Sequence, residues 1–229
     1  MKKILLILSM FSLTSLYAGE KNLYDFNWLD PDKAVYVLQN KVYEKEYTWY
    51  ANVGYGFSTS QDFQDASSIQ VKTGFYFTEE WGIELLYTKV SNSNSDTYKN
   101  VEEATSNVPY VRRFNTYYGA MAIFSPFYGK INTFNQIFYF DWNFGLGVVS
   151  VDNESNYKFF KQGVGTETTY DSESHTGFIY KMALRFFVTK NIDVNFDLIQ
   201  TRISVDSITS DKKVGFTNTD FIFAIGFSI

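Results

Sequence analysis

The chain has 229 residues, no cysteine and a net charge of −5, and aromatic residues make up 20% of it. A chain without cysteine forms neither disulfides nor thiolate metal sites, and its negative charge argues against nucleic-acid binding, which needs a basic face. Its 18 Tyr, 23 Phe and 4 Trp exceed what a soluble core of this length requires. A lipid-facing surface with aromatic girdles at two interfaces uses such a number.

The first 18 residues have the pattern of an export signal. Lys2 and Lys3 precede a short apolar stretch over 4–16, and Ala18 is a small residue suited to cleavage. The stretch is too short to span a bilayer as a helix. A buried N-terminal helix is the alternative. We predict a cleaved signal peptide over 1–18 and export through the inner membrane.

Residues 19–45 lack the pattern of the rest of the chain. A turn at Asp30-Pro31-Asp32 precedes a stretch over 34–43 that is first apolar and then charged. We predict a short N-terminal periplasmic segment here. A periplasmic arm, a short helix packed under the following domain and an early extension of its first strand all fit these residues.

Strict alternation of large apolar with small or polar residues marks 46–229, as expected where strand side chains point to opposite faces. Near the C-terminus, Phe221, Phe223 and Phe227 share one face, and Asp220 and Gly226 lie on the other. The predicted strands are 47–58, 68–77, 81–88, 113–124, 138–148, 177–186, 192–199 and 217–229. Such lengths cross the hydrocarbon layer when tilted. In the fourth strand the facing is the least clear.

The connections between these strands alternate in length. The segments 78–80, 125–131 and 189–191 are short, 92–112 and 153–174 are long and polar, and 59–67 and 206–216 are intermediate. Short periplasmic turns, long outer loops and two periplasmic termini are typical of bacterial outer-membrane barrels. We find no 3.6-residue period between the strands. The predicted fold is therefore all-β: an eight-stranded antiparallel up-and-down transmembrane β-barrel over 46–229.

The ring-rich face of each strand is predicted to point into lipid. Its main aromatic members are Trp49, Phe77, Trp81, Phe138, Phe140, Trp142, Phe221, Phe223 and Phe227. The opposite face turns inward, where an eight-stranded barrel has room only for side chains, so no open pore is expected.

Charges of both signs fall on the inward face. They are Lys72, Glu84, Arg113, Asp141, Lys181, Arg185, Asp193, Asp197 and Asp220. Buried charges need partners, so we predict a salt-bridged lumen network that fixes the barrel register. A narrow, gated ion path is the alternative.

The short turns suggest which of these charges are neighbours. Arg185 should face Asn195 and lie diagonal to Asp193 and Asp197. Lys72 should be a diagonal neighbour of Glu84 across the turn at 78–80, and Asp141 and Lys181 should lie at similar height on adjacent strands.

Enzymatic chemistry finds little support in the sequence. The one histidine, His175, follows Ser172, Glu173 and Ser174, the residue types that a lipid-modifying serine enzyme pairs. Alternation, however, turns His175 toward the lumen and away from acyl chains. Since the chain has no cysteine, no second histidine and no acidic loop with calcium-site spacing, no metal or other cofactor is predicted. We expect no catalytic residues.

Three segments carry a family resemblance. These are Val-Leu-Gln-Asn-Lys-Val-Tyr over 37–43, Gly-Phe-Tyr-Phe-Thr-Glu-Glu-Trp-Gly-Ile-Glu over 74–84 and Ser-Pro-Phe-Tyr-Gly-Lys over 125–130. They resemble the short outer-membrane β-barrel domain proteins of gliding and predatory Gram-negative bacteria. The resemblance implies an eight-stranded barrel with an N-terminal periplasmic segment, no catalytic residues, and partners in the cell envelope.

The sequence thus favours an integral outer-membrane protein that is structural or serves as a docking component of the envelope. Outer-membrane lipid and an envelope or extracellular protein are the expected partners, the protein binding through the outer loops. A small channel or a lipid-binding barrel is the second hypothesis, and a lipid-modifying outer-membrane enzyme is the third.

Overall fold

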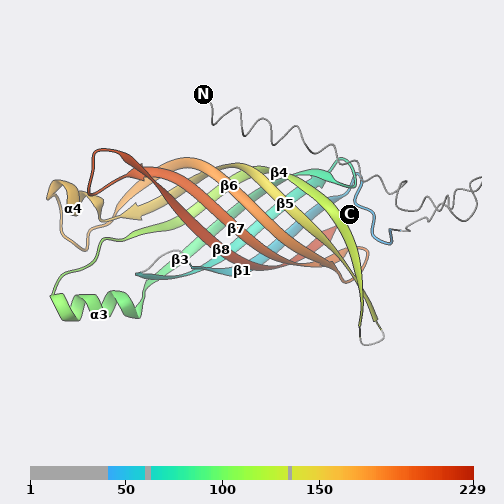
Figure 1. Ribbon diagram of the computed structural model, residues 1–229, viewed down its shortest axis with the longest axis horizontal. Coiled ribbons are helices and arrows are strands. Elements are labelled where there is room, and N and C mark those ends of the chain that lie inside the picture. Colours follow the sequence, from blue (N-terminus) through green and yellow to red (C-terminus); the bar gives the residue numbers. More distant parts are fainter. Residues whose placement is uncertain (1–40, 60–62, 134–135) are drawn as a thin grey trace, which may run out of the picture. The chain divides into compact units, whose positions relative to one another are not determined.

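Eight antiparallel strands close into a ring in the computed structural model, which describes residues 41–59, 63–133 and 136–229 (Figure 1). Each strand pairs with the next, and β8 pairs with β1. The strands are β1 Trp49–Ser58, β2 Gln64–Tyr76, β3 Trp81–Asn94, β4 Arg112–Thr133, β5 Gln136–Ser155, β6 Asp171–Phe187, β7 Ile192–Asp206 and β8 Lys213–Ser228. The all-β, eight-stranded up-and-down fold is confirmed. The predicted signal peptide, 1–18, and most of the predicted segment 19–45 lie outside the described residues.

The alternation in the sequence is the reason for closure. Along β1, Trp49, Val53 and Phe57 are exposed, and Tyr50 and Asn52 between them are buried. A closed ring has no free sheet edge, so within the ring the backbone of each strand is paired on both sides. No helix in the described part of the chain has the length and apolar character needed to cross a membrane.

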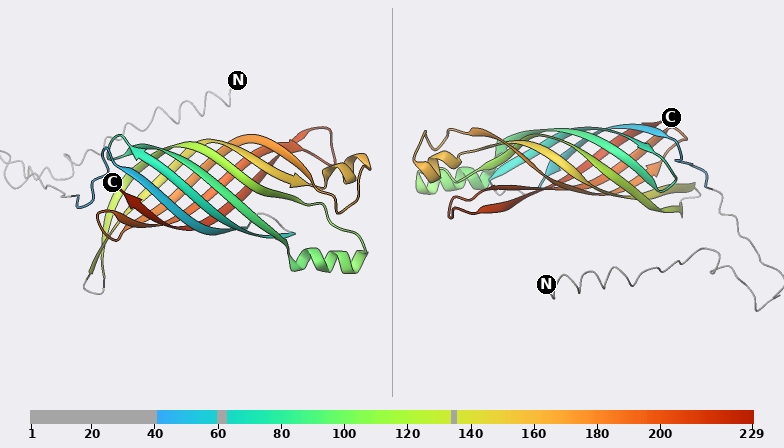
Figure 2. Two further views of the ribbon diagram at one scale, coloured as in Figure 1. Left: turned by 180° about the vertical axis from the view of Figure 1, so that it is seen from behind. Right: turned by 90° about the horizontal axis from the view of Figure 1, so that it is seen from above.

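The outer loops are shorter than predicted and contain two helices. Strand β2 begins within the predicted loop 59–67. The loop over 92–112 contains α3, Asp96–Thr105, and the loop over 153–174 contains α4, Tyr157–Gln162. Ser95 caps α3, because its hydroxyl accepts a hydrogen bond from the Tyr98 amide. Both helices lie between strands, where the sequence shows no clear 3.6-residue period. Figure 2 shows both helices at one end of the barrel and the C-terminus at the other.

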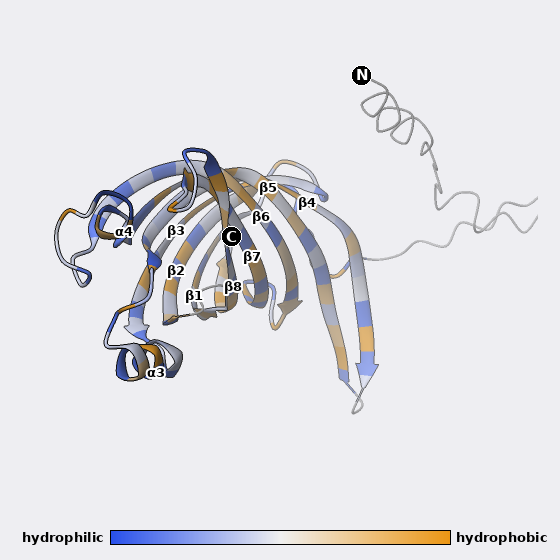
Figure 3. Cartoon of the chain, turned by 60° about the vertical axis from the view of Figure 1, so that its left-hand side comes forward, coloured by the Kyte–Doolittle hydropathy of each residue, from blue (hydrophilic) through white to orange (hydrophobic). Residues whose placement is uncertain are grey.

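The predicted turn at 125–131 is also wrong, because β4 and β5 continue together as a hairpin to Thr133 and Gln136. Pairing of β4 with β3 ends at Phe124, and pairing of β5 with β6 ends at Tyr139. The hairpin therefore extends beyond the ring (Figures 1 and 3). A register shift between Phe124 and Phe127, at the position of Pro126, marks where it departs. Proline lacks an amide donor and suits such a bulge.

Candidate functional site

Four ion pairs fill the lower lumen, the half of the barrel nearest the C-terminus. Lys72 pairs with Asp197, Lys181 Nζ lies 2.5 Å from Glu84 Oε1, and Arg185 Nη2 lies 2.6 Å from Asp193 Oδ2. The fourth pair joins Lys45 to Asp141. All eight side chains are at most 5% exposed. Four cations thus balance four anions in an interior where an unpaired charge would be very costly.

The partners differ in part from those expected. Arg185 does face Asn195 in register and binds the diagonal Asp193. Lys72 and Glu84 are diagonal neighbours on β2 and β3, yet each binds across the barrel, to β7 and β6. Strand order alone cannot reveal such pairs, because a long side chain in a narrow ring reaches a strand that is not adjacent.

Lys45 is a lumen residue that the sequence did not indicate. It precedes β1, yet its Nζ lies 2.8 Å from Asp141 Oδ2 and donates to Ser125 Oγ at 2.6 Å. Its backbone amide donates to Glu79 Oε1 at 2.9 Å, and the Nζ also lies 5.2 Å from the ring centre of Tyr76. Residues 43–45 of the predicted periplasmic segment thus belong to the barrel. Tyr43 stacks on Phe187 at 4.8 Å.

The ion pairs leave little space in the lower lumen. The cavity left among the charged side chains and their neighbours has a volume of about 10 Å³, and its lining includes Tyr50, Tyr76, Asn143, Lys181 and Arg185. A space of this size holds at most one water molecule. Tyr50 donates to Glu84 at 2.7 Å and Tyr76 to Asn143 at 2.9 Å, so the rings close the gaps between the ion pairs.

The upper lumen, toward the helices, is lined by apolar and mostly uncharged polar side chains, which differs from the ionised interior expected from the sequence. Phe114, Val151 and Ile203 are each at most 1% exposed there. Asp220 lies fully buried, with Tyr117 OH and Asn218 Nδ2 both donating to its Oδ2 at 2.8 Å. Among the described ion pairs none includes Asp220. Its carboxyl group is instead hydrogen-bonded by the phenol and amide donors.

Arg113 was wrongly placed in the lumen. Its side chain pairs with Glu154 at 2.9 Å across β4 and β5 and lies over the Tyr170 ring, whereas Arg112 is the buried arginine and binds Glu173. A register shift between Phe114 and Thr116 inserts one extra residue into β4. Such a bulge reverses which alternate residues face inward, and alternation counted from the sequence cannot detect it.

Glu173 gathers the polar groups at the upper mouth. Besides Arg112, it accepts from Ser155 Oγ at 2.9 Å and lies 3.0 Å from His175 Nε2. A serine nucleophile needs its hydroxyl bonded to the base. Here Ser155 and His175 both bind the carboxylate, and no described hydroxyl bonds to His175. The described residues also contain no group of three acidic or histidine side chains that could hold a metal ion.

Above the mouth, the loop that carries α3 packs on a small core of its own. Tyr98, Val108 and Val111 are buried together, with Phe63 and Tyr170 against them. Burial and the hydrogen bond between the Tyr98 and Tyr170 hydroxyls raise the pKa of Tyr98 to about 12. On α4, Phe160 is 41% exposed, and Val164 just beyond it is 57% exposed.

The exterior of the ring is apolar. The residues predicted to face lipid are outward and exposed in the structure except Phe140, which is half-buried: Trp49, Phe77, Trp81, Phe138, Trp142, Phe221, Phe223 and Phe227. Phe140 covers Gly129 of the facing strand and packs on Phe186 at 5.9 Å. Figure 3 shows apolar and polar residues alternating along the strands.

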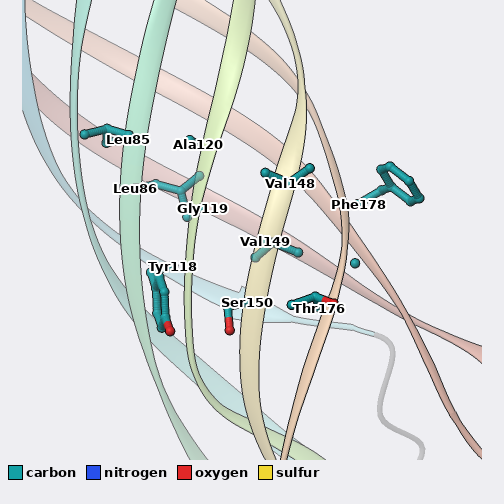
Figure 4. A pocket seen from close by; sticks show the side chains of 11 residues that line it. Leu85, Leu86, Tyr118, Gly119, Ala120, Val148, Val149, Ser150, Thr176 and Phe178 are labelled. Atoms are coloured by element: carbon teal, nitrogen blue, oxygen red, sulfur yellow. The ribbon is translucent and has the colours of Figure 1, made fainter.

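A groove of about 690 Å³ lies between β3 and β6 on this exterior (Figure 4). Leu85, Val148 and Phe178 line its sides, and the small residues Gly119 and Ala120 form its base. Tyr118, Ser150 and Thr176 are register partners and place three hydroxyl-bearing side chains at one end of the groove, away from the apolar residues.

A closed eight-stranded ring with an ion-paired interior and an apolar exterior defines the class of small membrane-spanning β-barrels. No protein-family model matches the chain, and no curated protein matches it.

Among solved structures, the chain is similar to the attachment invasion locus protein Ail of Yersinia pestis (13% identity, TM-score 0.43, covering 80% of this chain and 99% of that chain). It is also similar to two Pseudomonas aeruginosa proteins. One is the N-terminal β-barrel domain of OprF, with 8% identity and a TM-score of 0.48, covering 80% of this chain and 98% of that chain. The other is the outer membrane protein OprG, with 12% identity and a TM-score of 0.46, covering 82% of this chain and 98% of that chain.

Proposed function

We propose that this protein is a non-conducting, non-enzymatic outer-membrane barrel that acts as a structural or docking component of the cell envelope. One observation carries the proposal: four buried ion pairs leave about 10 Å³ of space in the lower lumen of a ring whose exterior is apolar. The exterior suits lipid, and the interior leaves no path for ions or solutes.

The connection lengths support an orientation with the short turns and the C-terminus in the periplasm. The connections after β2 and β6, residues 77–80 and 188–191, lie at the same end as Ile229, which bonds to Trp49. Helices α3 and α4 then extend outside the cell, in the place where outer-membrane barrels carry their longer loops.

The loops supply the surface for a protein partner. Phe160 and Val164 expose apolar side chains next to the charged residues of α4, among them Lys158 and Lys161. Apolar anchors within a polar surround are typical of binding surfaces. The envelope partners implied by the resemblance to proteins of gliding and predatory bacteria remain a prediction of the same kind.

Planar-bilayer recording on the purified, refolded barrel tests the sealed lumen. We expect no steady openings, whereas large openings at wild-type sequence would overturn the proposal. For docking, a photo-crosslinking residue at Phe160 in intact cells should capture a protein that the same residue at Lys190, in a periplasmic turn, does not. Equal capture at both positions would remove the role assigned to the loops.

A further inference from the structure

The hairpin that extends beyond the ring has two different faces. Cross-strand register places Phe127 opposite Trp142 and Ile131 opposite Phe138 on one face. The other face pairs Lys130 with Tyr139, and Asn132 with Ile137. On the first face, Phe127 is 61% exposed, Ile131 46% and Phe138 40%. The hairpin is therefore amphipathic in part: its exposed phenylalanines lie on this face, whereas the other face combines Lys130 and Asn132 with Ile137, which is 51% exposed.

The apolar face is continuous with the exterior of the barrel. The Phe127–Trp142 pair follows directly on the outward Phe124–Phe144 pair, despite the extra residue at the bulge. The face that contacts lipid along the ring thus runs on, without interruption, into the part of β4 and β5 that has left the ring. A bulge bends its strand, so this face can follow the membrane boundary instead of the barrel wall.

The opposite face is more polar, although it includes one exposed aliphatic residue, Ile137. Lys130 and Asn132 are exposed. Nearer the ring, Tyr128 and Tyr139 stack at 6.0 Å, and Tyr139 meets Tyr43 edge-on at 5.4 Å. The base of the hairpin is thus held against the barrel through this side, which leaves the apolar side turned away from the lumen.

From these features we infer that the two hairpin arms, 126–133 and 136–142, form a membrane-surface anchor, which rests on the membrane integration proposed above. Its apolar face lies on the periplasmic leaflet, with Phe127, Ile131 and Phe138 in the interfacial lipid, and Lys130 and Asn132 face the periplasm. Moving exposed apolar area from water into lipid is favourable in proportion to that area, and aromatic side chains favour the interface.

Site-directed fluorescence tests this placement. The chain has no cysteine, so a single introduced cysteine can carry an environment-sensitive NBD label. The labelled positions are Ile131→Cys and Phe138→Cys on the apolar face, Asn132→Cys as the matched control on the opposite face, and Val53→Cys on the outward face of β1 as a membrane reference. Each variant is refolded into phosphatidylcholine–phosphatidylglycerol vesicles and checked for heat-modifiable migration on a gel.

We expect blue-shifted emission and loss of intensity with doxyl-labelled phospholipid at 131, 138 and 53, and quenching by aqueous iodide at 132. If 53 responds to the lipid quencher but 131 and 138 respond only to iodide, the anchor is refuted and the membrane barrel stands. If 53 also fails to respond, the membrane proposal itself falls. Protection of 131 from both quenchers would mean that protein covers the face, which also overturns the inference.

Discussion

The Lys45 ammonium lies 2.8 Å from the Asp141 carboxylate, so a residue that precedes the first strand closes the lumen from below. Both side chains are at most 3% exposed. The pair ties the segment before β1 to β5, on the far side of the ring in strand order. The end of the barrel is thereby sealed by an ion pair that belongs to no strand pairing.

Replacing Lys45 by alanine should lower the free energy of unfolding strongly. The change deprives the buried Asp141 carboxylate of this ammonium, and breaking one side of a buried pair costs about 3–5 kcal/mol. Urea unfolding in phospholipid vesicles, followed by tryptophan fluorescence, measures the loss. Glu46→Ala, at the exposed neighbouring position, is the control and should change little. A K45A barrel as stable as the E46A barrel would show that the pair does not stabilise the fold.

The Lys72–Asp197 pair predicts a different pattern when both partners are changed. Lys72→Met alone leaves a buried carboxylate uncompensated and should cost about 3–5 kcal/mol, whereas adding Asp197→Leu should recover most of that loss, because apolar replacement of a whole buried pair is often neutral. A double-mutant cycle in the same unfolding assay separates the two contributions. If the double variant is less stable than K72M, the pair has further partners that matter more than its own charges.

These two pairs also show how far the sequence could lead. Alternation placed Lys72, Asp141 and Asp197 on the inward face, because one face of every strand must be polar or small when the other meets lipid. Which cation meets which anion depends on distances across the ring. Strand order does not contain these distances, so the sequence correctly predicts the diagonal neighbour of Lys72 on β3 but not the partner on β7 that it binds.

Departures from regular strand pairing explain the other predictions that were wrong. The bulge before Thr116 reversed the facing of Arg113, and the bulge after Phe124 turned a predicted turn into the start of a hairpin. The residue types at a bulge rarely identify it in a sequence, although a proline within a strand, such as Pro126, can indicate one. Lys45 escaped notice because the pattern before β1 is not periodic. Helix α3 is short, and its cap at Ser95 lies in a polar loop that reads as irregular.

Glycines inside the ring should be irreplaceable where backbone lies opposite them. A Cβ at Gly147 would contact the Ala120 carbonyl oxygen and come within 2.6 Å of Met121 Cα. Gly147→Ala should therefore destabilise the barrel by about 1–3 kcal/mol, the usual cost of overpacking. Gly215→Ala is the matched control, since the atoms nearest to a Cβ there belong to the flexible end of the Arg202 side chain, at 3.1 Å. Equal urea midpoints for the two variants would contradict this account.

The cap of α3 allows the loop to be loosened without touching the barrel. Ser95→Ala removes the hydroxyl that accepts from the Tyr98 amide, and loss of such a cap costs about 1 kcal/mol. Limited proteolysis of the folded protein in vesicles should show faster cleavage within 96–111, with an unchanged urea midpoint. Ser93→Ala, which removes a hydroxyl that donates to the Asp65 carbonyl oxygen and does not cap the helix, should not speed cleavage. A lowered urea midpoint for S95A would mean that the loop and the ring unfold together.

The same loop should open at alkaline pH. Burial raises the pKa of Tyr98 from 10.0 to about 12, so between these values the open loop holds fewer protons than the closed one. The stability of the closed loop is therefore fully present below pH 10 and falls as the pH rises from about 10 to 12. The difference in phenolate absorbance between wild type and Tyr98→Phe should show a midpoint near the raised value. In the S95A background the midpoint should move down toward 10.0 as the loop loosens. A wild-type midpoint already at 10.0 would show that water reaches the Tyr98 hydroxyl and that the small core around it does not form.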